Sequence, residues 1–597
     1  MLNEALSRSP WVQHYGRVPA SLSYSDGSLW EAVFESAEKY PDTPALNYFG
    51  KTIAYTALRE KIERCARAFK ALGIERGDRI TICMPNTPEA VISFYAINVI
   101  GAVANMIHPL SAENEIKRFV NVSKSRVIVA INISAKKIER IINDTQLEKV
   151  IVVSPKDSMP LPLSIGYQIT KGRDVKKVNH EKFVSFRAFM RGADNFVDDY
   201  KVKGKGNDFA VILYSGGTTG ESKGIMLSNL NFNALAVQGF AMCDCLEPQD
   251  KVLSIMPIFH GFGLGICIHT ALYHGVTAII LPQFDVKTFH KLMATYKPHV
   301  IAGVPTLYEA IMRNEKMESV NLSFLKCAIS GGDSLSVSTK EKVDEFLKRC
   351  GATVQVREGY GLTECVTGSC LNPRSDTKAG SIGIPYPDTL YKIVKPGTHE
   401  TLPYGEVGEI CLSGPTLMLG YLDDEEETHR VVQRHEDGLI WLFTGDLGYM
   451  EADGYFYFKQ RIKRVITTSG YNVYPQNIEN IIDSHPDVLY STAIGLPDEY
   501  RGQRIKVYIV LKKGVTPTEA VKNSIKEHCT LNIVKYAIPK EFEYRDSLPK
   551  TLVGKVDYRA LELENSRTVE LENSRTVEAE NNLALELEKL ENNATEN

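Results

Sequence analysis

The chain of 597 residues lacks several features that mark large classes of protein. Its net charge is −4, without the excess of lysine and arginine expected of a protein that binds nucleic acid. No basic segment followed by an apolar core opens the chain, so we expect no secretory signal and a cytoplasmic protein. The uncharged stretches 90–107 and 261–282 are broken by polar residues, and we expect buried elements there, with no integral membrane span.

Clustered metal-ligand residues are also scarce. The 11 cysteines are scattered, several of them within apolar runs, which is typical of reduced and buried thiols. Only Cys243 and Cys245 lie close together in the sequence. Because no second cysteine or histidine pair at metal-ligand spacing accompanies them, we expect no zinc site.

A loop rich in glycine and hydroxyl groups follows the apolar run 209–214. Glycines allow a close approach of the backbone to a ligand, while hydroxyls and an ammonium group donate to oxyanions. The spacing differs from the Walker A loop, because the lysine is followed by glycine. The pattern predicts a polyphosphate site of another kind, and a polar hairpin turn is the alternative. The candidate residues are Ser215, Gly216, Gly217, Thr218, Thr219, Gly220 and Lys223.

Strands and helices alternate on both sides of this loop, which indicates parallel sheets covered by helices. From about residue 405 the short strands indicate antiparallel structure. We therefore expect an α/β protein with a large N-terminal domain, 1–460, that has doubly covered sheets and a β-barrel-like part. A small mobile α+β domain, 461–560, and an acidic tail, 561–597, with a duplicated eight-residue segment would follow.

The segment 354–364 places a set of polar side chains after an expected strand. Tyr360 can stack on a base, and Glu358 can accept from an exocyclic amine, although a carboxylate cannot donate to a ring nitrogen. Thr363 can donate to a phosphate and Glu364 can hold Mg²⁺ through oxygen. Together these residues indicate a nucleotide site.

Two other positions are candidates for contacts to small ligands. Asp446, which follows Thr-Gly, can accept from ribose hydroxyls; alone it would be a turn aspartate. Phe259 and His260 stand at the end of an expected strand and could wall a carboxylate pocket. For a lone histidine, a satisfied position in the core is an equally common role.

In this order along the chain, the motifs resemble the adenylate-forming superfamily, which includes acyl- and aryl-CoA synthetases, luciferases and the adenylation domains of peptide synthetases. The resemblance covers about residues 29–560 and also includes Arg461-Ile-Lys463 and Lys555. It implies a two-step ligase: a carboxylate attacks the α-phosphate of ATP to give acyl-AMP and pyrophosphate, and a thiol then displaces AMP.

The resemblance also implies roles for individual residues. Lys555, Thr363, Glu364 and His260 would be catalytic, and Glu364 with Thr218 would place Mg²⁺. Besides the loop 215–223, the ATP-binding residues would be Gly332, Glu358, Gly359, Tyr360, Asp446 and Arg461. Lys463 would be the hinge of the mobile domain, Gly470 and Tyr471 would line the CoA tunnel, and Phe259, His260 and Gly331 would form the acyl pocket.

The chain departs from the family pattern at four positions, Gly216, Ser222, Glu358 and Gln460. None of these departures removes a charged catalytic group. No tryptophan lies where acetate-type enzymes close the pocket, so we expect a medium- or long-chain or aromatic acid as substrate, with CoA as acceptor. An alternative is an acyl-AMP ligase that loads a carrier-protein thiol. A binding protein without turnover is a third reading, which the retained charged residues disfavour.

Overall fold

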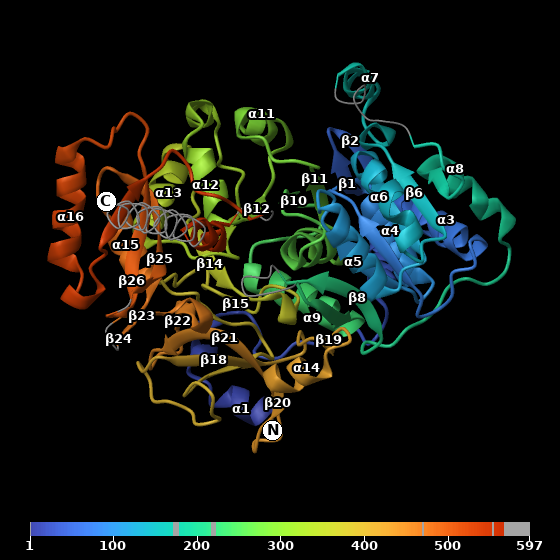
Figure 1. Cartoon of the computed structure of the whole chain (residues 1–597). Helices are drawn as coiled ribbons and strands as arrows, with labels where there is room; N and C mark the ends of the chain where they lie inside the picture. Colours follow the sequence, from blue (N-terminus) through green and yellow to red (C-terminus); the bar gives the residue numbers. More distant parts are fainter. Residues whose placement is uncertain are drawn as a thin grey trace, which may run out of the picture. The chain divides into compact units, whose positions relative to one another are not determined.

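The structure, a computed structural model, describes residues 2–170, 178–215, 222–468, 471–498, 500–551 and 555–565. Contacts divide the chain into two units, Met1–Phe458 and Lys459–Asn597 (Figure 1). The first contains three sheets and most of the helices, and the second is a small α+β unit. The predicted fold class is therefore confirmed.

An eight-stranded sheet carries the glycine-rich loop. Its order is β19-β9-β8-β4-β3-β5-β6-β7, in which the strands from β8 to β7 are parallel. Strands β4 and β5 are buried along their whole length, which requires cover on both faces. The strands are β3 (Arg79–Cys83), β4 (Val103–Ile107), β5 (Val127–Ile131), β6 (Lys149–Val153), β7 (Phe183–Ser185), β8 (Phe209–Tyr214), β9 (Gly224–Ser228) and β19 (Gly420–Tyr421).

A nine-stranded sheet brings the other motifs of this unit together. Its order is β16-β15-β14-β13-β12-β10-β11-β1-β2, and the strands from β14 to β1 are parallel. Ligands of such sheets bind beyond the carboxyl ends of the strands. The strands are β1 (Pro44–Tyr48), β2 (Lys51–Ala54), β10 (Lys251–Ser254), β11 (Thr277–Ile280), β12 (Val300–Gly303), β13 (Cys327–Ser330), β14 (Val356–Tyr360), β15 (Cys370–Leu371) and β16 (Ile384–Pro385).

Helices join and cover these strands (Figure 1). Many of them carry one apolar face. They are α2 (Leu29–Lys39), α3 (Tyr55–Ala71), α4 (Pro88–Val99), α5 (Glu113–Ser123), α6 (Ala135–Ile141), α7 (Leu161–Ile169), α8 (Phe186–Arg191), α9 (Asn229–Cys243), α10 (Thr270–Tyr273), α11 (Val286–Tyr296), α12 (Pro305–Met312) and α13 (Val337–Arg349), preceded by the short α1 (Leu2–Ser7).

The uncharged stretches are buried elements, as predicted. Every residue of α4 is buried, and the helix begins after Thr87, whose hydroxyl accepts from the Ala90 amide at 3.3 Å. Asn86, just before it, donates to the carbonyls of Ser254 and Met256 at 3.0 and 2.8 Å and so links the ends of β3 and β10. Among the described residues, no helix is both long and apolar enough to cross a membrane.

The third sheet is antiparallel. Its strands are ordered β17-β18-β21-β20, and β22 pairs with β21. Within the part of the chain that the structure describes, no pairing closes it, so the part expected to resemble a β-barrel is an open sheet. The elements are β17 (Leu390–Val394), β18 (Gly408–Ser413), β20 (Val432–Arg434), β21 (Ile440–Met450), β22 (Phe456–Arg461) and helix α14 (Glu425–Val431).

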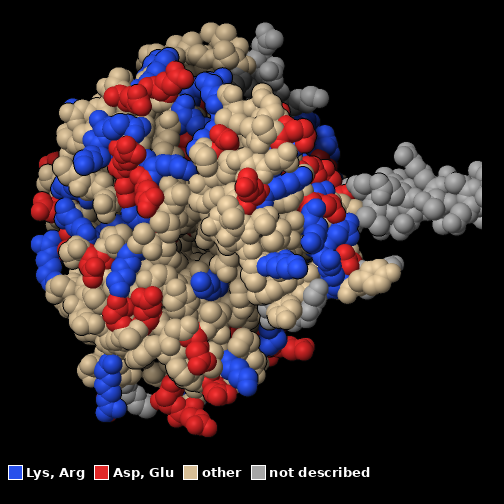
Figure 2. All heavy atoms as spheres, turned by 90° about the vertical axis from the view of Figure 1, so that its left-hand side faces the viewer, with Lys and Arg blue, Asp and Glu red and all other residues tan. Residues whose placement is uncertain are grey.

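Charged side chains of both signs cover the surface. On the face drawn in Figure 2, basic and acidic side chains are interspersed, and the described residues form no continuous basic area there. Exposed ion pairs also occur elsewhere in the described chain, such as Arg126 with Glu148 at 2.8 Å. Such exposed pairs contribute little to stability.

The C-terminal unit has its own sheet and core. The strands are ordered β24-β23-β26-β25, and β27 adds to β26 in parallel; α15 packs on β25, and α16 contacts α15. Residues 561–565, from the predicted tail, are helical, and Leu561 is buried in this unit; the rest of the tail lies outside the described residues. The elements are β23 (Ile466–Thr468), β24 (Tyr471–Val473), β25 (Val488–Asp498), β26 (Gly502–Leu511), β27 (Glu541–Tyr544), α15 (Pro475–Asp483) and α16 (Glu519–Asn532).

A buried ion pair lies next to the expected hinge in this unit. The Arg464 guanidinium lies 2.5 Å from the Glu479 carboxylate, whose Oε1 also accepts from the Thr492 hydroxyl and the Ala493 amide at 3.0 and 2.9 Å. Glu479 is 6% exposed. Removing one partner of such a pair leaves an uncompensated buried charge.

We therefore expect Arg464→Met to destabilise the C-terminal unit by about 3 kcal/mol or more. Hydrogen exchange followed by mass spectrometry on peptides from β25 and β26 would measure the loss of protection. The matched control is Lys522→Met, which breaks an exposed pair with Glu519 and should cost less than about 1 kcal/mol. Equal protection in the two variants would contradict the prediction.

Candidate active site

The ends of the glycine-rich loop are closed by the β8–β9 hairpin. The Ser215 amide donates to the Lys223 carbonyl at 3.2 Å, and the Lys223 amide donates to the Ser215 hydroxyl at 3.3 Å. The predicted phosphate contacts between these two residues, Gly216, Gly217, Thr218, Thr219 and Gly220, lie outside the described residues. The structure thus places the base of the loop at the carboxyl end of β8.

Lys223 contacts residues that sequence reasoning missed. Its ammonium pairs with the Glu427 carboxylate and lies 4.8 Å from the centre of the Tyr421 ring. Arg430 also binds Glu427, at 2.5 and 2.6 Å. Hydrogen bonds from Arg430 and Lys223 lower the pKa of Glu427 to about 2. A phosphate that binds Lys223 would therefore replace a carboxylate that is ionised at neutral pH.

The Tyr421 hydroxyl connects this lysine to the second predicted motif. It donates to Glu364 Oε1 at 2.9 Å, and the Met418 amide donates to the Glu364 carbonyl at 2.8 Å. Glu364 and Thr363 belong to a short 3₁₀ helix, Thr363–Cys365, that follows β14. Lys223 and Glu364, which are far apart in sequence, are thus brought to the two sides of one tyrosine.

Tyr360 and Asp446 also lie together. The Tyr360 hydroxyl donates to Asp446 Oδ2 at 2.7 Å, and the Asp446 amide donates to the Thr444 hydroxyl at 3.1 Å. Asp446 is 2% exposed, and a positive φ of 71° at Gly445 lets the chain turn between the threonine and the aspartate. This contact brings an aromatic face and a ribose-type acceptor to one place, as the nucleotide prediction requires.

Glu358 is the most perturbed acid of the predicted site. It is 7% exposed, and its Oε1 has no hydrogen-bond partner among the described residues. Burial raises the pKa of the carboxyl to about 8, with Lys340 lowering it and Asp344 raising it further. The side chain therefore carries a proton at neutral pH and can donate as well as accept. This differs from the expectation of a carboxylate that only accepts.

Gly331 and Gly332 follow β13 beside this residue. The Gly331 amide donates to the Gly303 carbonyl at 3.0 Å, and a Cβ added at Gly331 would lie 3.2 Å from the Gly359 carbonyl. Gly332 has a positive φ of 81°. The two glycines keep the space at the ends of β13 and β14 free of side chains.

The expected acyl residues lie just before a π-helix, Phe262–His269. The Phe259 ring lies 4.4 Å from the His108 ring. The Phe262 amide donates to His260 Nδ1 at 3.2 Å, so the neutral imidazole carries its proton on Nε2. A half-buried histidine in this tautomer can donate a hydrogen bond to a carboxylate.

A strained turn packs these two segments together. Val366 has φ 66° and ψ −58°, and the Thr367 amide donates to the Cys365 carbonyl at 2.8 Å, which defines a γ-turn of the rare, positive-φ kind. A Cβ added at Gly261 would lie 1.7 Å from the Val366 carbonyl oxygen. Only glycine therefore fits at position 261.

We expect Gly261→Ala to destabilise the N-terminal unit by about 3 kcal/mol and to weaken ATP binding, because the added methyl group displaces the turn after Glu364. Urea unfolding followed by tryptophan fluorescence reports on this unit, since all 3 tryptophans lie in it. Gly192→Ala is the matched control, because a Cβ there meets nothing within 4 Å. A midpoint equal to that of the control would refute the clash.

The remaining predicted residues belong to the C-terminal unit. Two hydrogen bonds join Lys555 to Thr551: the Thr551 amide donates to the Lys555 carbonyl at 2.7 Å, and the Lys555 amide donates to the Thr551 hydroxyl at 3.2 Å. Arg461 ends β22 and Lys463 lies in a 3₁₀ helix, Ile462–Arg464. The Tyr471 ring is 55% exposed and stacks on Tyr536 at 4.4 Å. Gly470 is outside the described residues.

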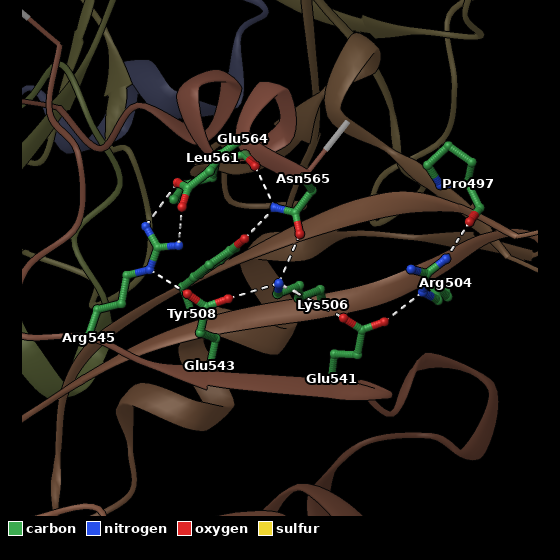
Figure 3. A network of polar contacts seen from close by, with 10 residues as sticks. All are labelled: Pro497, Arg504, Lys506, Tyr508, Glu541, Glu543, Arg545, Leu561, Glu564 and Asn565. Carbon is green, nitrogen blue, oxygen red and sulfur yellow. Dashed lines mark hydrogen bonds and ion pairs between the residues drawn. The ribbon is translucent and has the colours of Figure 1, made fainter. Parts of the chain in front are cut away.

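A polar network fixes the segment that follows Lys555 (Figure 3). Asn565 accepts from the Lys506 ammonium at 2.8 Å and donates to the Tyr508 hydroxyl, and Lys506 also pairs with Glu543 at 2.8 Å. Arg545 binds Glu564 with two nitrogens at 2.8 and 3.1 Å. These contacts hold the terminal helical segment, 558–565, against β26 and β27 and so restrict the position of Lys555.

Two family descriptions match the chain, AMP-binding enzyme over residues 33–422 and AMP-binding enzyme C-terminal domain over residues 477–555. The chain belongs to this family of adenylate-forming enzymes. The resemblance seen in the sequence is therefore confirmed, and the chain is an enzyme of the AMP-forming acid–CoA ligase family.

Several known proteins match this ligase over nearly its full length. The long-chain-fatty-acid–CoA ligase of Bacillus subtilis is 32% identical over 568 residues, covering 94% of this chain and 99% of the relative. The ligase of the same name from Salmonella typhimurium is 31% identical over 569 residues, covering 93% and 98%.

Solved structures agree with the fold. ATP-bound MatB from Rhodopseudomonas palustris has a TM-score of 0.77 and is 26% identical, covering 90% of this chain and 98% of that one. The anthranilate CoA ligase AuaEII in complex with anthranoyl-AMP has a TM-score of 0.78 at 24% identity, covering 92% and 98%.

Proposed function

We propose that this ligase activates a long-chain fatty acid with ATP and transfers it to CoA in the cytoplasm. The observation that carries the proposal is the match, over more than nine-tenths of both chains, to relatives that are named long-chain-fatty-acid–CoA ligases. An aromatic acid is the second candidate, because the 4-coumarate–CoA ligase 1 of Solanum tuberosum is 27% identical over 538 residues.

The surroundings of the expected acyl site support a large substrate. Gly331 presents no side chain at the ends of β13 and β14, where the Gly359 carbonyl oxygen would lie 3.2 Å from an added Cβ, and no tryptophan side chain fills this place. Trp11 packs on Phe456, the Trp30 indole donates to the Val202 carbonyl, and the Trp441 indole donates to Asp437. Phe259 and His260 would line the entrance of the carboxylate, with His260 donating from Nε2.

In the first step, a carboxylate oxygen attacks the α-phosphorus of ATP, the bond to the β-phosphate oxygen breaks, and pyrophosphate leaves. The carboxylate is already ionised at neutral pH and needs no general base, so positioning and charge neutralisation supply the catalysis. Lys555 would bridge the carboxylate and the α-phosphate, and Thr363 would hold that phosphate. Lys223 and the loop before it would bind the outer phosphates.

The nucleoside would lie between the two strand ends. Glu358 and the Gly359 backbone would meet the adenine, Tyr360 would stack on it, and Asp446 with Arg461 would hold the ribose, while Gly332 leaves room for the base. Glu364 and Thr218 supply the oxygen atoms that Mg²⁺ prefers, and the bound ion would neutralise phosphate charge.

In the second step, the CoA sulfur attacks the acyl carbonyl carbon and AMP leaves. Lys463 would be the hinge at which the small domain turns between the two steps, and Gly470 and Tyr471 would line the path of the pantetheine arm. A carrier-protein thiol is the alternative acceptor, since its phosphopantetheine arm presents the same nucleophile.

The test is carboxylate-dependent release of pyrophosphate from Mg-ATP across a panel of fatty and aryl acids, with and without CoA. We expect release to require a long-chain acid and acyl-CoA to accumulate only when CoA is present. Preference for an aryl acid would overturn the substrate class. If the adenylate forms but reacts only with the phosphopantetheine thiol of a carrier protein and never with CoA, the acceptor is the carrier protein.

A further inference from the structure

Three thiols that are scattered in the sequence meet inside the N-terminal unit. Cys243 ends α9, and Asp244, with a left-handed φ of 53°, turns the chain so that Cys245 lies beside it, with the two sulfur atoms 3.5 Å apart. Cys327, the first residue of β13, completes the group, and the three sulfur atoms lie within 4.8 Å of one another. The mechanism of the ligase uses none of them.

The guanidinium of Arg357 lies against this thiol cluster, which consists of Cys243, Cys245 and Cys327. Its Nη1 lies 3.9 Å from the Cys327 sulfur and donates to the Cys243 carbonyl at 3.0 Å. The other contacts are to the carbonyls of Asn372 and Met242, both at 2.7 Å. Arg357 is 4% exposed, and among the described residues no carboxylate pairs with it.

A buried cation of this kind needs an anion near it, because the cost of removing a charge from water is otherwise uncompensated. Thiolates are the anions that the cluster can supply. A thiolate at Cys327 would lie beside the Arg357 guanidinium, whose Nη1 is 3.9 Å from the sulfur.

We propose that Cys243, Cys245 and Cys327 form a three-thiolate binding site for a soft divalent cation such as Zn²⁺. Bonds of about 2.3 Å in a tetrahedral arrangement separate the sulfur atoms by about 3.8 Å, which the cluster reaches with small shifts of its side chains. Three thiolates, one divalent cation and the Arg357 guanidinium also sum to zero charge, so the buried group is neutral as a whole.

The fourth coordination position is open to water or a small thiol. Among the described residues, no histidine, no carboxylate and no further cysteine joins the three thiols. Cys245 is only partly buried, which gives access from solvent. Two of the thiols are buried, at 4% exposure for Cys243 and 2% for Cys327. The proposed site differs from the expectation of no zinc, which rested on sequence spacing alone.

The position of the site suggests what the cation would do. It would join the end of α9 to β13, while Arg357 joins the site to β14, one residue before Glu358. Successive residues of a strand point to opposite faces, so the cation would lie on the far side of β14 from Glu358. We infer a structural role: the cation fastens the strand that leads to Gly331 and the strand that carries Glu358 and Tyr360.

Metal binding is measured directly on the untagged full chain, reduced and dialysed against a chelator. We expect one Zn²⁺ per chain by mass spectrometry of the metal after re-addition, and a thermal midpoint that rises with free Zn²⁺. Substitution by Co²⁺ should give the sulfur-to-metal charge-transfer absorption of thiolate ligands. Wild-type protein that binds no Zn²⁺ and shows no such absorption would overturn the proposal without recourse to any variant.

Variants locate the site. Cys243→Ser, Cys245→Ser and Cys327→Ser should each weaken Zn²⁺ binding more than tenfold, and Arg357→Gln should weaken it by about 10 to 100-fold as a neighbour of the ligands. The matched control is Cys350→Ser, a buried thiol that contacts the Met317 carbonyl instead. Equal loss in the control would point to nonspecific binding and refute the site.

A disulfide is the competing use of the same thiols. It would need only two of the three cysteines and would remove the anions beside Arg357. Alkylation of the native protein under non-reducing conditions, followed by peptide mass spectrometry, distinguishes the cases. Two results together would overturn the proposal: a disulfide between two of the three cysteines in the native protein, and no Zn²⁺ binding after that disulfide is reduced. The cysteines would then form a redox pair and not a metal site.

Discussion

Replacing Lys555 by alanine is expected to slow adenylate formation by about 10² to 10³-fold, while transfer of the acyl group from preformed acyl-AMP to CoA stays nearly unchanged. The ammonium group would neutralise charge that develops at the α-phosphate only in the first step. The loss should therefore be in kcat of pyrophosphate release, with a smaller change in the KM for ATP. Stopped-flow measurement of each half-reaction separates the two rates.

The hairpin that carries Lys555 supplies a matched control. Lys550 lies on the opposite arm, where it pairs with Val556 in an antiparallel bridge. Lys550→Ala removes the same charge from the same turn and should leave both half-reactions within a factor of a few of the wild type. If both variants are slowed alike, the effect is one of general charge, and the assignment of Lys555 is wrong.

A contiguous stretch of sequence contains most of the predicted nucleotide site. Glu358, Tyr360 and Glu364 lie within seven residues of one another, in a segment that reads as a strand followed by a polar turn. The same short segment therefore predicts both the strand and the polar side chains at its end. The strand β8 and the buried helix α4 could also be predicted from local sequence, because an apolar run marks the strand and an apolar run with a capping residue marks the helix. These predictions needed no knowledge of tertiary contacts.

Partners that arrive from distant segments were not predictable in the same way. Glu427 and Tyr421 reach Lys223 across about 200 residues of sequence, and neither stands in a motif. Cys327 joins Cys243 only because the end of the helix α9 lies near the start of the strand β13. The strained γ-turn at Val366 likewise follows from packing against Gly261, which overrides the low tolerance of a β-branched residue for positive φ.

The protonation state of Glu358 is the consequence of such packing. The sequence shows an acid where the family often has an amide, and it suggests a carboxylate. The structure buries that acid, which raises its pKa to about 8. At neutral pH a protonated carboxyl resembles an amide, since it has one donor and one acceptor, so Glu358 can meet the adenine as the amide would.

We therefore expect kcat/KM for ATP to fall above about pH 8, approaching tenfold per pH unit, because the free enzyme then loses the proton that Glu358 donates. Glu358→Gln keeps a donor and an acceptor without titrating. Its kcat/KM for ATP should lie within a factor of a few of the wild type at pH 7 and stay level at high pH. Wild-type and variant profiles that fall together would assign the loss to another group.

Stability gives a second readout with a defined sign. Below pH 4.5, Glu358 is protonated in both the folded and the unfolded chain. Between pH 4.5 and about 8 only the unfolded chain releases the proton, so each pH unit lowers the stability of the wild type by about 1.4 kcal/mol through this group. Above pH 8 both states are ionised and the difference stays constant.

The Gln variant should thus gain stability relative to the wild type by a few kcal/mol as the pH rises from 5 to 8, as measured by urea unfolding through tryptophan fluorescence. Glu345→Gln on α13 is the control, because its side chain is 73% exposed and should give a difference that does not change with pH. A constant difference for Glu358→Gln as well would mean that the buried acid ionises near its normal pH, and the donor role would fail with it.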